Sequence, residues 1–245
     1  MCPPPGPVAK PERYRERVEE FVLARIGAPP ARVLEVGCGE GELARALARA
    51  GHSVTAIDPR APEWEPGGPA FQRTTIEEFS GPGPFDHVVA SLSLHHVEDL
   101  AAALDKVMYL LSTGGTLIVL EFAWDRIDEA TAAWVLERLP PPSPSGKPSW
   151  LERRLRGRAQ GGDGGHHGHG DHAGAHPGGW AEEGLHGSRR MLTELERRFV
   201  ELHLEWVPYL YPDLEDGVSE ADERAAIEAG TINAVGLRYV GTPAV

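Results

Sequence analysis

Short runs of apolar, often branched residues alternate with helical hydrophobic patterns along the first half of the chain. Each run is too short for a helix and indicates a buried β-strand. Strands that alternate with helices predict an α/β fold, in which right-handed crossovers join the strands of a parallel sheet. The predicted strands cover residues 31–36, 52–58, 70–73, 85–94 and 116–122.

The segments between these runs place apolar residues at helical spacing. In residues 97–111, Leu100, Leu104 and Val107 fall on one helical face, which predicts a helix that buries one side. The same pattern predicts a helix that begins at Pro11 and stops at Pro29, and a second helix over residues 41–51.

Residues 124–199 contain no convincing strand and are predicted to form a helical insertion that covers the sheet edge. Met191 and Leu195 lie on one face of its last helix, for which Ser188 is the expected N-cap. The other expected parts are a helix over 128–139, a proline cluster over 140–148, a basic helical piece over 150–158 and a glycine- and histidine-rich loop over 161–179.

Two more strands are expected after this insertion. They cover residues 200–210 and 236–241, and a helix over 222–230 lies between them. The pattern therefore predicts about seven strands in all, with the insertion before the sixth.

Composition and charge favour one globular domain and exclude some partners. Of the 245 residues, 41% are hydrophobic, and no apolar run approaches the roughly 20 residues that cross a bilayer. The formal net charge of −13 argues against a nucleic-acid partner, because that binding depends on clustered lysine and arginine. Two cysteines and an N-terminus without an apolar core predict a cytoplasmic protein. We expect a disordered tail over 1–11 and one domain over 12–245; no pattern indicates an oligomeric state.

The segment with the clearest chemical meaning joins the first predicted strand to the helix after it. Gly37, Gly39 and Gly41 let the backbone approach a ligand closely and adopt positive φ angles. The helix N-terminus beyond them offers unpaired N–H groups that suit an anionic group. Asp58 ends the second predicted strand, where a carboxylate is placed to accept hydrogen bonds from a ribose diol.

These features alone fit more than one nucleotide cofactor. Gly39, Gly41 and Ala44 satisfy the looser dinucleotide fingerprint of NAD(P)-dependent oxidoreductases, G-x-G-x-x-G/A. Glu35, however, lies inside the strand, and its carboxylate would repel a pyrophosphate but attract the amine and sulfonium of a sulfonium amino acid. The fingerprint also leaves Gly37 unexplained. We therefore favour the sulfonium cofactor and keep the oxidoreductase as the alternative.

This segment, Val33–Leu43, resembles motif I of the class I S-adenosylmethionine-dependent methyltransferases, and the resemblance extends from about Ala31 to Trp124. It implies a Rossmann-like three-layer sandwich with a seven-stranded, mostly parallel sheet and an antiparallel last strand. It also implies S-adenosylmethionine as the cofactor and in-line methyl transfer to a small-molecule acceptor. The residues that it places at the cofactor are Glu35, Val36, Gly37, Cys38, Gly39, Gly41, Asp58, Pro59, Thr75, Ile76, Glu77 and Ser91.

Two later segments extend the resemblance, with departures. Residues 90–97 resemble the family's segment after the fourth strand, and residues 110–122 resemble its L-x-P-G-G strand. Thr75 stands where many members have aspartate, and Thr113 replaces the usual proline. The chain from Gly184 onward more weakly resembles a bacterial small-molecule branch of the family.

The predicted carboxyl edge of the sheet carries the candidates for chemistry. His95 and His96 follow the fourth strand, and Glu121 ends the fifth, at the edge where such folds bind ligands. A histidine there could take a proton from an acceptor hydroxyl near neutral pH. The same histidines could instead be structural, hydrogen-bonded residues. Candidates for lining the acceptor pocket are Trp124, His186, Trp206 and Tyr209.

The glycine- and histidine-rich loop suggests a different hypothesis. Its imidazoles could bind Zn²⁺ or Ni²⁺, which would make the chain a non-catalytic, methyltransferase-like protein that binds metal or a partner. Flexible glycine spacing, however, sets no coordination geometry. We therefore predict no metal site and expect a disordered loop.

Overall fold

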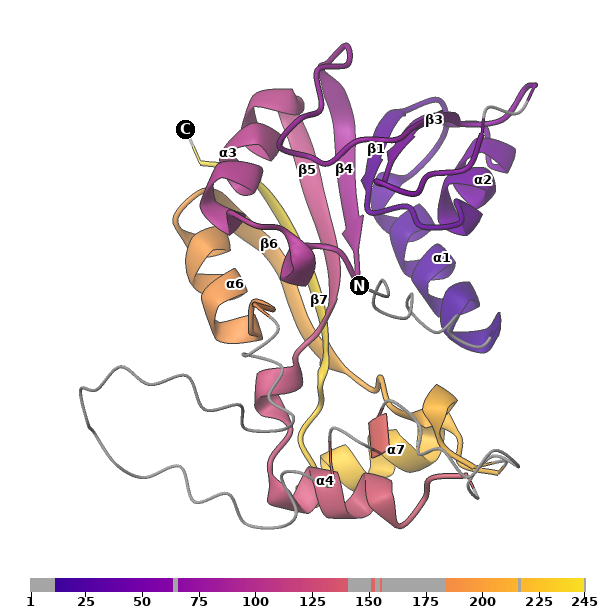
Figure 1. The fold of residues 1–245 in the computed structure, drawn as a ribbon, viewed down its shortest axis with the longest axis vertical. Coiled ribbons are helices and arrows are strands. Elements are labelled where there is room, and N and C mark those ends of the chain that lie inside the picture. The colour runs from indigo at the N-terminus through magenta and orange to yellow at the C-terminus, as the bar shows by residue number, and fades with distance from the viewer. Residues whose placement is uncertain are drawn as a thin grey trace, which may run out of the picture.

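The centre of the protein is one seven-stranded sheet with the strand order β3-β2-β1-β4-β5-β7-β6 (Figure 1). The computed structural model describes residues 12–63, 66–140, 151–152, 155, 184–215 and 217–244. The strands are β1 (Arg32–Val36), β2 (Ser53–Ile57), β3 (Ala70–Gln72), β4 (Phe85–Ser91), β5 (Leu111–Phe122), β6 (Phe199–Val207) and β7 (Gly236–Pro243).

The pairing of the strands matches the predicted sheet. The five strands from β1 to β5 pair in parallel, and β7 pairs antiparallel with both β5 and β6. The last strand is therefore the antiparallel one, as the resemblance implied. The predicted α/β fold with seven strands is confirmed.

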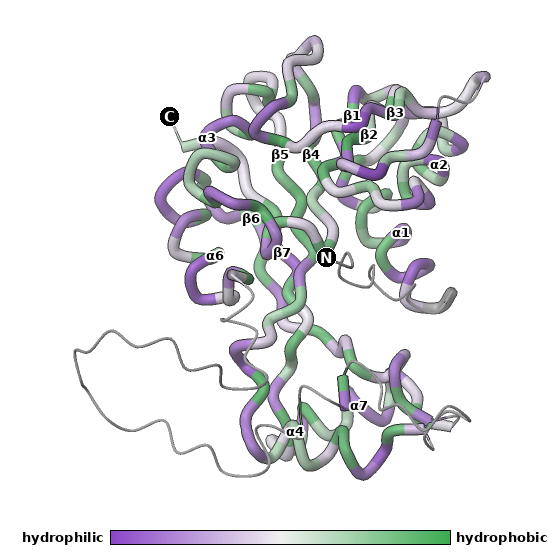
Figure 2. Tube along the Cα trace, in the orientation of Figure 1, coloured by the Kyte–Doolittle hydropathy of each residue, from purple (hydrophilic) through white to green (hydrophobic). Residues whose placement is uncertain are grey.

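Helices cover both faces of this sheet because successive strand residues point to opposite sides. Val33, Val89 and Ile118 pack with α1 and α2, whereas Leu34, Val88 and Leu117 pack with α3 and α6. The core positions appear as hydrophobic stretches along β4 and β5 in Figure 2. The helices are α1 (Glu12–Ile26), α2 (Glu42–Arg49), α3 (Leu100–Leu110), α4 (Glu129–Leu136), α6 (Ser188–Glu196) and α7 (Glu220–Glu228), with short 3₁₀ turns η1 (Leu94–His96), η2 (Trp124–Arg126) and η4 (Tyr211–Asp213).

The strand β5 begins earlier than its apolar pattern predicts. The pattern places the strand at 116–122, but Leu111 already pairs with Phe85 of β4. The helix α3 starts at Leu100, where the Asp99 side chain accepts from the Ala102 N–H as an N-cap. Because α3 ends at Leu110 and β5 begins at Leu111, the helix and the strand meet without a connecting loop.

The N-cap of α6 differs from the expected one. Gly187 occupies the N-cap position and Ser188 is already helical, so the prediction of Ser188 as the cap was wrong. The carboxylate of Asp125 takes the capping role, because it accepts from the backbone N–H groups of Ser188 (2.8 Å) and Arg189 (3.2 Å). A residue 63 positions away in the sequence thus satisfies this helix end.

A third hydrophobic cluster forms a lobe beyond the carboxyl edge of the sheet, where Figure 1 shows α4 and α7. Phe122, Trp134 and Tyr209 are among its buried members. The helix α6, in contrast, packs against α3 beside the sheet. The expected insertion therefore contributes to two places, with α4 in the lobe and α6 in a sheet layer. The expected tail over 1–11 and the loop over 161–179 lie outside the described residues.

Candidate active site

The glycine loop after β1 is tied to the end of β2. The N–H groups of Gly37 and Cys38 both donate to the carbonyl oxygen of Ile57, at 2.8 and 3.0 Å. Gly37 has a φ of +76°, and a Cβ at this position would overlap the Cβ of Ser93. The loop therefore needs glycine here for its backbone conformation and for its close contact with the segment after β4.

The second half of the loop is held by Asp58. Oδ2 of Asp58 accepts from the Gly39 N–H at 3.1 Å, and Oδ1 accepts from the Arg60 N–H at 2.7 Å. Gly39 and Gly41 have φ angles of +50° and +76°, and Gly41 is the N-cap of α2. The carboxylate predicted to bind a ribose thus lies beside the loop that leads into α2.

Glu35 lies under this loop with an unsatisfied oxygen. Glu35 is 3% exposed, and its Oε2 has no hydrogen-bond partner among the described residues. Burial raises the pKa of the Glu35 carboxyl to about 8; a hydrogen bond from Ala44 lowers the pKa, and the charge of Asp58 adds to the increase. An isolated buried carboxyl of this kind is suited to a cationic donor brought by a ligand.

The other predicted loop residues have less to offer a ligand. Val36 is buried in the core, and Pro59 is exposed at the start of the turn after β2. Burial raises the pKa of the Cys38 thiol to about 12, and the thiol contacts the Gly39 carbonyl. Cys38 therefore stays a protonated thiol, which does not favour a nucleophilic role.

The segment predicted to bracket an adenine follows β3. Ile76 is 2% exposed and packs in the core with Phe79, while Glu77 is exposed. Thr75 is half-buried, and its hydroxyl accepts from the Glu78 N–H at 3.3 Å. The hydroxyl of Thr75 therefore stabilises the turn that carries Ile76.

Sequence reasoning named Ser91 but missed Ser93. Ser91 is half-buried at the end of β4, whereas Ser93 is buried and its Oγ has no partner among the described residues. Between them Leu92 adopts a φ of +52°, which is rare for a residue with a branched side chain. This strained turn aims Ser93 at Gly37. No sequence pattern marks Ser93, because the contact joins two loops far apart in the chain.

Glu121 organises the carboxyl edge between β4 and β5. Its side chain is 0% exposed. Oε1 accepts from the N–H groups of Ser93 (2.9 Å) and Leu94 (2.7 Å), and Oε2 lies 2.6 Å from Nδ1 of His95. The structure places His95 and Glu121, both expected at this edge, in direct hydrogen-bond contact. His96 is exposed, and its ring lies 4.1 Å from that of His95.

His186 connects the segment before α6 to this turn through two hydrogen bonds. Its N–H donates to the His95 carbonyl at 3.0 Å, and its Nε2 donates to the Val97 carbonyl at 2.9 Å. Trp124 Nε1 donates to the His186 carbonyl at 3.3 Å. Burial and the charge of Arg190 lower the pKa of His186, so its imidazole is neutral near pH 7. Trp124 and His186 therefore lie beside His95.

The other two acceptor candidates, Trp206 and Tyr209, lie near the end of β6 and just after it. Tyr209 is buried, and its ring stacks on Phe122 with centroids 4.7 Å apart. Trp206 is half-buried beneath the guanidinium of Arg126, whose Cζ lies 3.9 Å from the ring centroid. Trp206 therefore packs on η2, the turn that begins with Trp124, whereas Tyr209 packs in the core of the lobe.

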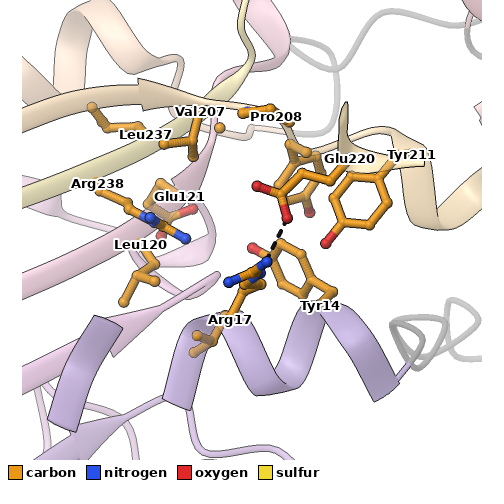
Figure 3. Close-up of a pocket in the computed structure, with 13 residues that line it drawn as sticks. Tyr14, Arg17, Leu120, Glu121, Val207, Pro208, Tyr211, Glu220, Leu237 and Arg238 are labelled. Carbon is orange, nitrogen blue, oxygen red and sulfur yellow. Dashed lines mark hydrogen bonds and ion pairs between the residues drawn. The ribbon is translucent and has the colours of Figure 1, made fainter. Parts of the chain in front are cut away.

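A small cavity lies where α1, the sheet edge and the lobe meet (Figure 3). Its volume is about 20 Å³, enough for a water molecule or two but not for an organic acceptor. Arg17 and Glu220 form an ion pair at 3.1 Å across its mouth. Leu120, Glu121 and Tyr209 contribute to the wall, with further residues Tyr14, Val18, Val207, Pro208, Tyr211, Gly236, Leu237 and Arg238.

Sequence reasoning also missed Glu223, a fully buried carboxylate on α7. It accepts from three consecutive backbone N–H groups, those of Tyr209, Leu210 and Tyr211, at 2.7–3.1 Å. These bonds hold the chain that leaves β6 and shapes the cavity wall. A glutamate among the other acidic residues of the first turn of α7 gives no signal of such burial.

Two properties of the described chain bear on the competing hypotheses. Within the described ranges, no three histidine, cysteine, aspartate or glutamate side chains gather as metal ligands would. The glycine- and histidine-rich loop is outside those ranges. Of the helices that the structure describes, none is long and apolar enough to span a membrane.

With this geometry in place, comparison with known proteins assigns the family. A family model described as a methyltransferase domain matches residues 10–202. The chain therefore belongs to this methyltransferase family. The match covers the glycine loop, Asp58, and the edge that carries His95 and Glu121.

Similar proteins include bacterial O-methyltransferases. The ubiquinone biosynthesis O-methyltransferase of Xylella fastidiosa (strain 9a5c) is 39% identical over 129 residues, which are 48% of this chain and 50% of that protein. The enzyme of the same name from Xanthomonas campestris pv. campestris (strain B100) is 38% identical over 112 residues, 41% of this chain and 46% of that protein. The chain thus spans about half the length of the curated relatives it matches.

Solved structures show the same fold. The N-methyltransferase NodS from Bradyrhizobium japonicum WM9, crystallised with S-adenosyl-l-homocysteine, has 17% identity and a TM-score of 0.52 over 96% of this chain and 88% of that one. An S-adenosylmethionine-dependent methyltransferase from Mesorhizobium loti has 19% identity and the same TM-score over 92% and 95%. At these identities the similarity supports the Rossmann-like fold.

Proposed function

We propose that this protein is an S-adenosylmethionine-dependent methyltransferase that acts on a small-molecule acceptor. The observation that carries the proposal is the unsatisfied, buried carboxyl of Glu35 beneath a glycine loop, with Asp58 at the end of the next strand. When bound, S-adenosylmethionine supplies a methyl group activated by a sulfonium. The family membership supports the same activity.

The residues present fit this methyl donor. Glu35 would accept from its cationic amine, and the N-terminus of α2 beyond Gly41 would face its carboxylate. The Asp58 carboxylate is fixed by two backbone N–H groups and keeps lone pairs for a ribose diol. We also place Ser93 at this site, because its buried hydroxyl lies against Gly37 without a partner in the described chain.

The alternative of a dinucleotide cofactor fits these residues less well. A pyrophosphate on the loop would lie over the Glu35 carboxyl. The carboxyl would then have to remain protonated, because the pyrophosphate brings it no cationic partner. The loop also uses Gly37, which lies outside the dinucleotide fingerprint, for its contact with Ser93.

The small-molecule acceptor is supported by the relatives and by the carboxyl edge. Two relatives are named as O-methyltransferases of ubiquinone biosynthesis. We place the acceptor beside His95, with Trp124 and His186 as its neighbours, because His186 hydrogen-bonds to the turn that carries His95 and Trp124 hydrogen-bonds to His186. The main contribution of the protein is alignment, since orienting two bound reactants can lower a barrier by roughly 7–11 kcal/mol.

The first test concerns Asp58. We expect Asp58→Asn to weaken binding of S-adenosylhomocysteine by about 10- to 100-fold, because the variant keeps the shape but loses a charge-assisted hydrogen bond. Isothermal titration calorimetry measures this, and Glu63→Ala, an exposed carboxylate in the same loop, serves as the control with unchanged affinity. Wild-type affinity in Asp58→Asn, or tighter binding of NADH than of S-adenosylhomocysteine, would contradict the proposal.

A second prediction follows from the pKa of Glu35. Because this pKa is raised to about 8, the carboxyl is protonated in the free protein at neutral pH, and a bound cationic amine favours its ionised form. Binding should therefore release a proton, and the affinity for S-adenosylhomocysteine should rise with pH, by at most about tenfold per pH unit, until pH 8.

Calorimetry between about pH 6 and pH 8, repeated in two buffers of different ionisation enthalpy, counts the released proton. Glu35→Gln is the matched control, because it removes the protein's titrating group and leaves that of the ligand. An identical pH dependence in wild type and Glu35→Gln would show that Glu35 does not face the amine.

A further inference from the structure

The hydrogen bonds of Glu121 determine the tautomer of His95. The carboxylate accepts from the N–H groups of Ser93 and Leu94, and its Oε2 lies 2.6 Å from Nδ1 of His95. A carboxylate can only accept, so the proton of the neutral imidazole stays on Nδ1. Nε2 is then left with its lone pair, and within the described chain it makes no hydrogen bond.

His95 lies at the carboxyl edge of the sheet, near the proposed site of the methyl donor. Ser93 touches Gly37 of the cofactor loop, and His95 follows two residues later on the same 3₁₀ turn, η1. Its side chain is 12% exposed, so the imidazole is largely shielded from water but still reachable. His95 is therefore a proton acceptor next to the proposed site of the methyl donor.

We propose that His95 is the catalytic base that removes the proton from a phenolic hydroxyl of the acceptor, and that Glu121 is the positioning residue that holds His95 in the required tautomer. This inference rests on the proposed function. It assigns the acceptor to a chemical class and gives the reaction its proton acceptor.

The step balances as follows in atoms and charge. Nε2 of His95 takes the hydroxyl proton while the oxygen forms a bond to the donor's methyl carbon. The carbon–sulfur bond breaks, its electron pair stays on sulfur, and the positive charge moves from the sulfonium to the imidazolium. The imidazolium, stabilised by Glu121, then releases its proton to water.

A phenol fits this base better than other acceptors do. A phenolic hydroxyl has a pKa near 10, which is within a few units of an imidazole, whereas an aliphatic alcohol is a far weaker acid. A thiolate would not need the base. A protonated amine would need it, and turnover with catechol and with benzylamine separates the two acceptors.

Among the residues that the structure describes, three titratable groups lie around His95. Glu121 faces it from β5, His186 from the segment before α6, and His96 from its own turn. Burial of the imidazole lowers the pKa of His95, but the charge of Glu121 and its hydrogen bond outweigh this, so the pKa of His95 is raised above its usual value. Methyl transfer should therefore be lost as pH falls below that raised pKa.

The first measurement is the tautomer itself. Nitrogen-15 NMR of histidine-labelled protein, with the His95 signal assigned by its loss in His95→Asn, should show Nδ1 protonated and Nε2 bare. In Glu121→Gln the amide oxygen can still accept from Ser93 and Leu94, while the amide N–H₂ donates to Nδ1 and moves the proton to Nε2. Glu98→Gln, an exposed residue of the same loop, should leave the signal unchanged.

The second measurement is turnover with S-adenosylmethionine and two probes, catechol and benzylamine. We expect methylation of catechol, with kcat reduced about 10²- to 10⁴-fold in His95→Asn and in Glu121→Gln. Glu98→Gln should keep wild-type kcat, and all variants should bind S-adenosylhomocysteine within about threefold of wild type, since none of these residues contacts the donor. His95→Asn covers the case in which Glu121→Gln fails to fold.

The outcomes separate this inference from the proposed function. Wild-type kcat in His95→Asn, or a wild-type tautomer with the proton on Nε2, would overturn the dyad. Methylation of benzylamine in place of catechol would overturn the assignment of a phenolic acceptor. If the wild-type protein does not bind S-adenosylhomocysteine, the proposed function is overturned instead, whatever the tautomer of His95.

Discussion

Replacing Gly37 by alanine is expected to lower the free energy of unfolding by about 2–5 kcal/mol and to abolish binding of S-adenosylhomocysteine. Gly37 has a φ of +76°, which costs an alanine roughly 1–2 kcal/mol. The added Cβ would also overlap the Cβ of Ser93, and overpacking of this kind costs about 1–3 kcal/mol more. Relief of the overlap must move the loop away from the turn that carries His95.

The chain offers a matched control for this prediction. Gly114 has a φ of +78°, but a Cβ there would meet no atom within 4 Å. Gly114→Ala should therefore show only the backbone cost, roughly 1–2 kcal/mol, and should bind the ligand normally. Urea unfolding of both variants gives the difference. Equal losses of stability would show that the contact between Gly37 and Ser93 is absent.

Glu223→Ala is expected to have a comparable effect, by a different mechanism. The change would leave the N–H groups of Tyr209, Leu210 and Tyr211 buried without acceptors, and each unsatisfied group costs about 1–3 kcal/mol. Partial rescue by water reduces the sum, so we expect a loss of about 3–5 kcal/mol. Thermal unfolding and urea unfolding measure it.

Glu228→Ala is the control for this variant, because Glu228 is exposed near the end of the same helix, α7. Its loss should change the free energy of unfolding by less than about 0.5 kcal/mol. A stability of Glu223→Ala close to that of Glu228→Ala would mean that another group accepts from these three N–H groups.

The fold was largely predictable because buried parallel strands have a simple pattern. Within residues 31–36 and 85–94, Val33 and Val89 face one helix layer while Leu34 and Val88 face the other, as expected of strands between two helix layers. The N-cap of α6 was not predictable. Ser188 fits the local preference for an N-cap, but the carboxylate of Asp125 caps the helix from a distant turn, and local sequence does not encode that contact.

The candidate site was predictable where one short segment determines it. The three alternate glycines and Glu35 lie in one strand–loop–helix unit, and their arrangement follows from its backbone. The hydrogen bond between His95 and Glu121 joins residues 26 positions apart, and Glu223 reaches a loop 12–14 positions away. Such contacts depend on tertiary packing, so the sequence named His95 and Glu121 individually without indicating their partnership.

A crystal structure of the protein soaked with S-adenosylhomocysteine tests the central claim most directly. We predict density for the amino acid over residues 37–41, with its amine within 3.2 Å or so of a Glu35 oxygen and both ribose hydroxyls at the Asp58 carboxylate. Density for the ligand at any other position, or an empty loop at saturating concentration, would contradict the account.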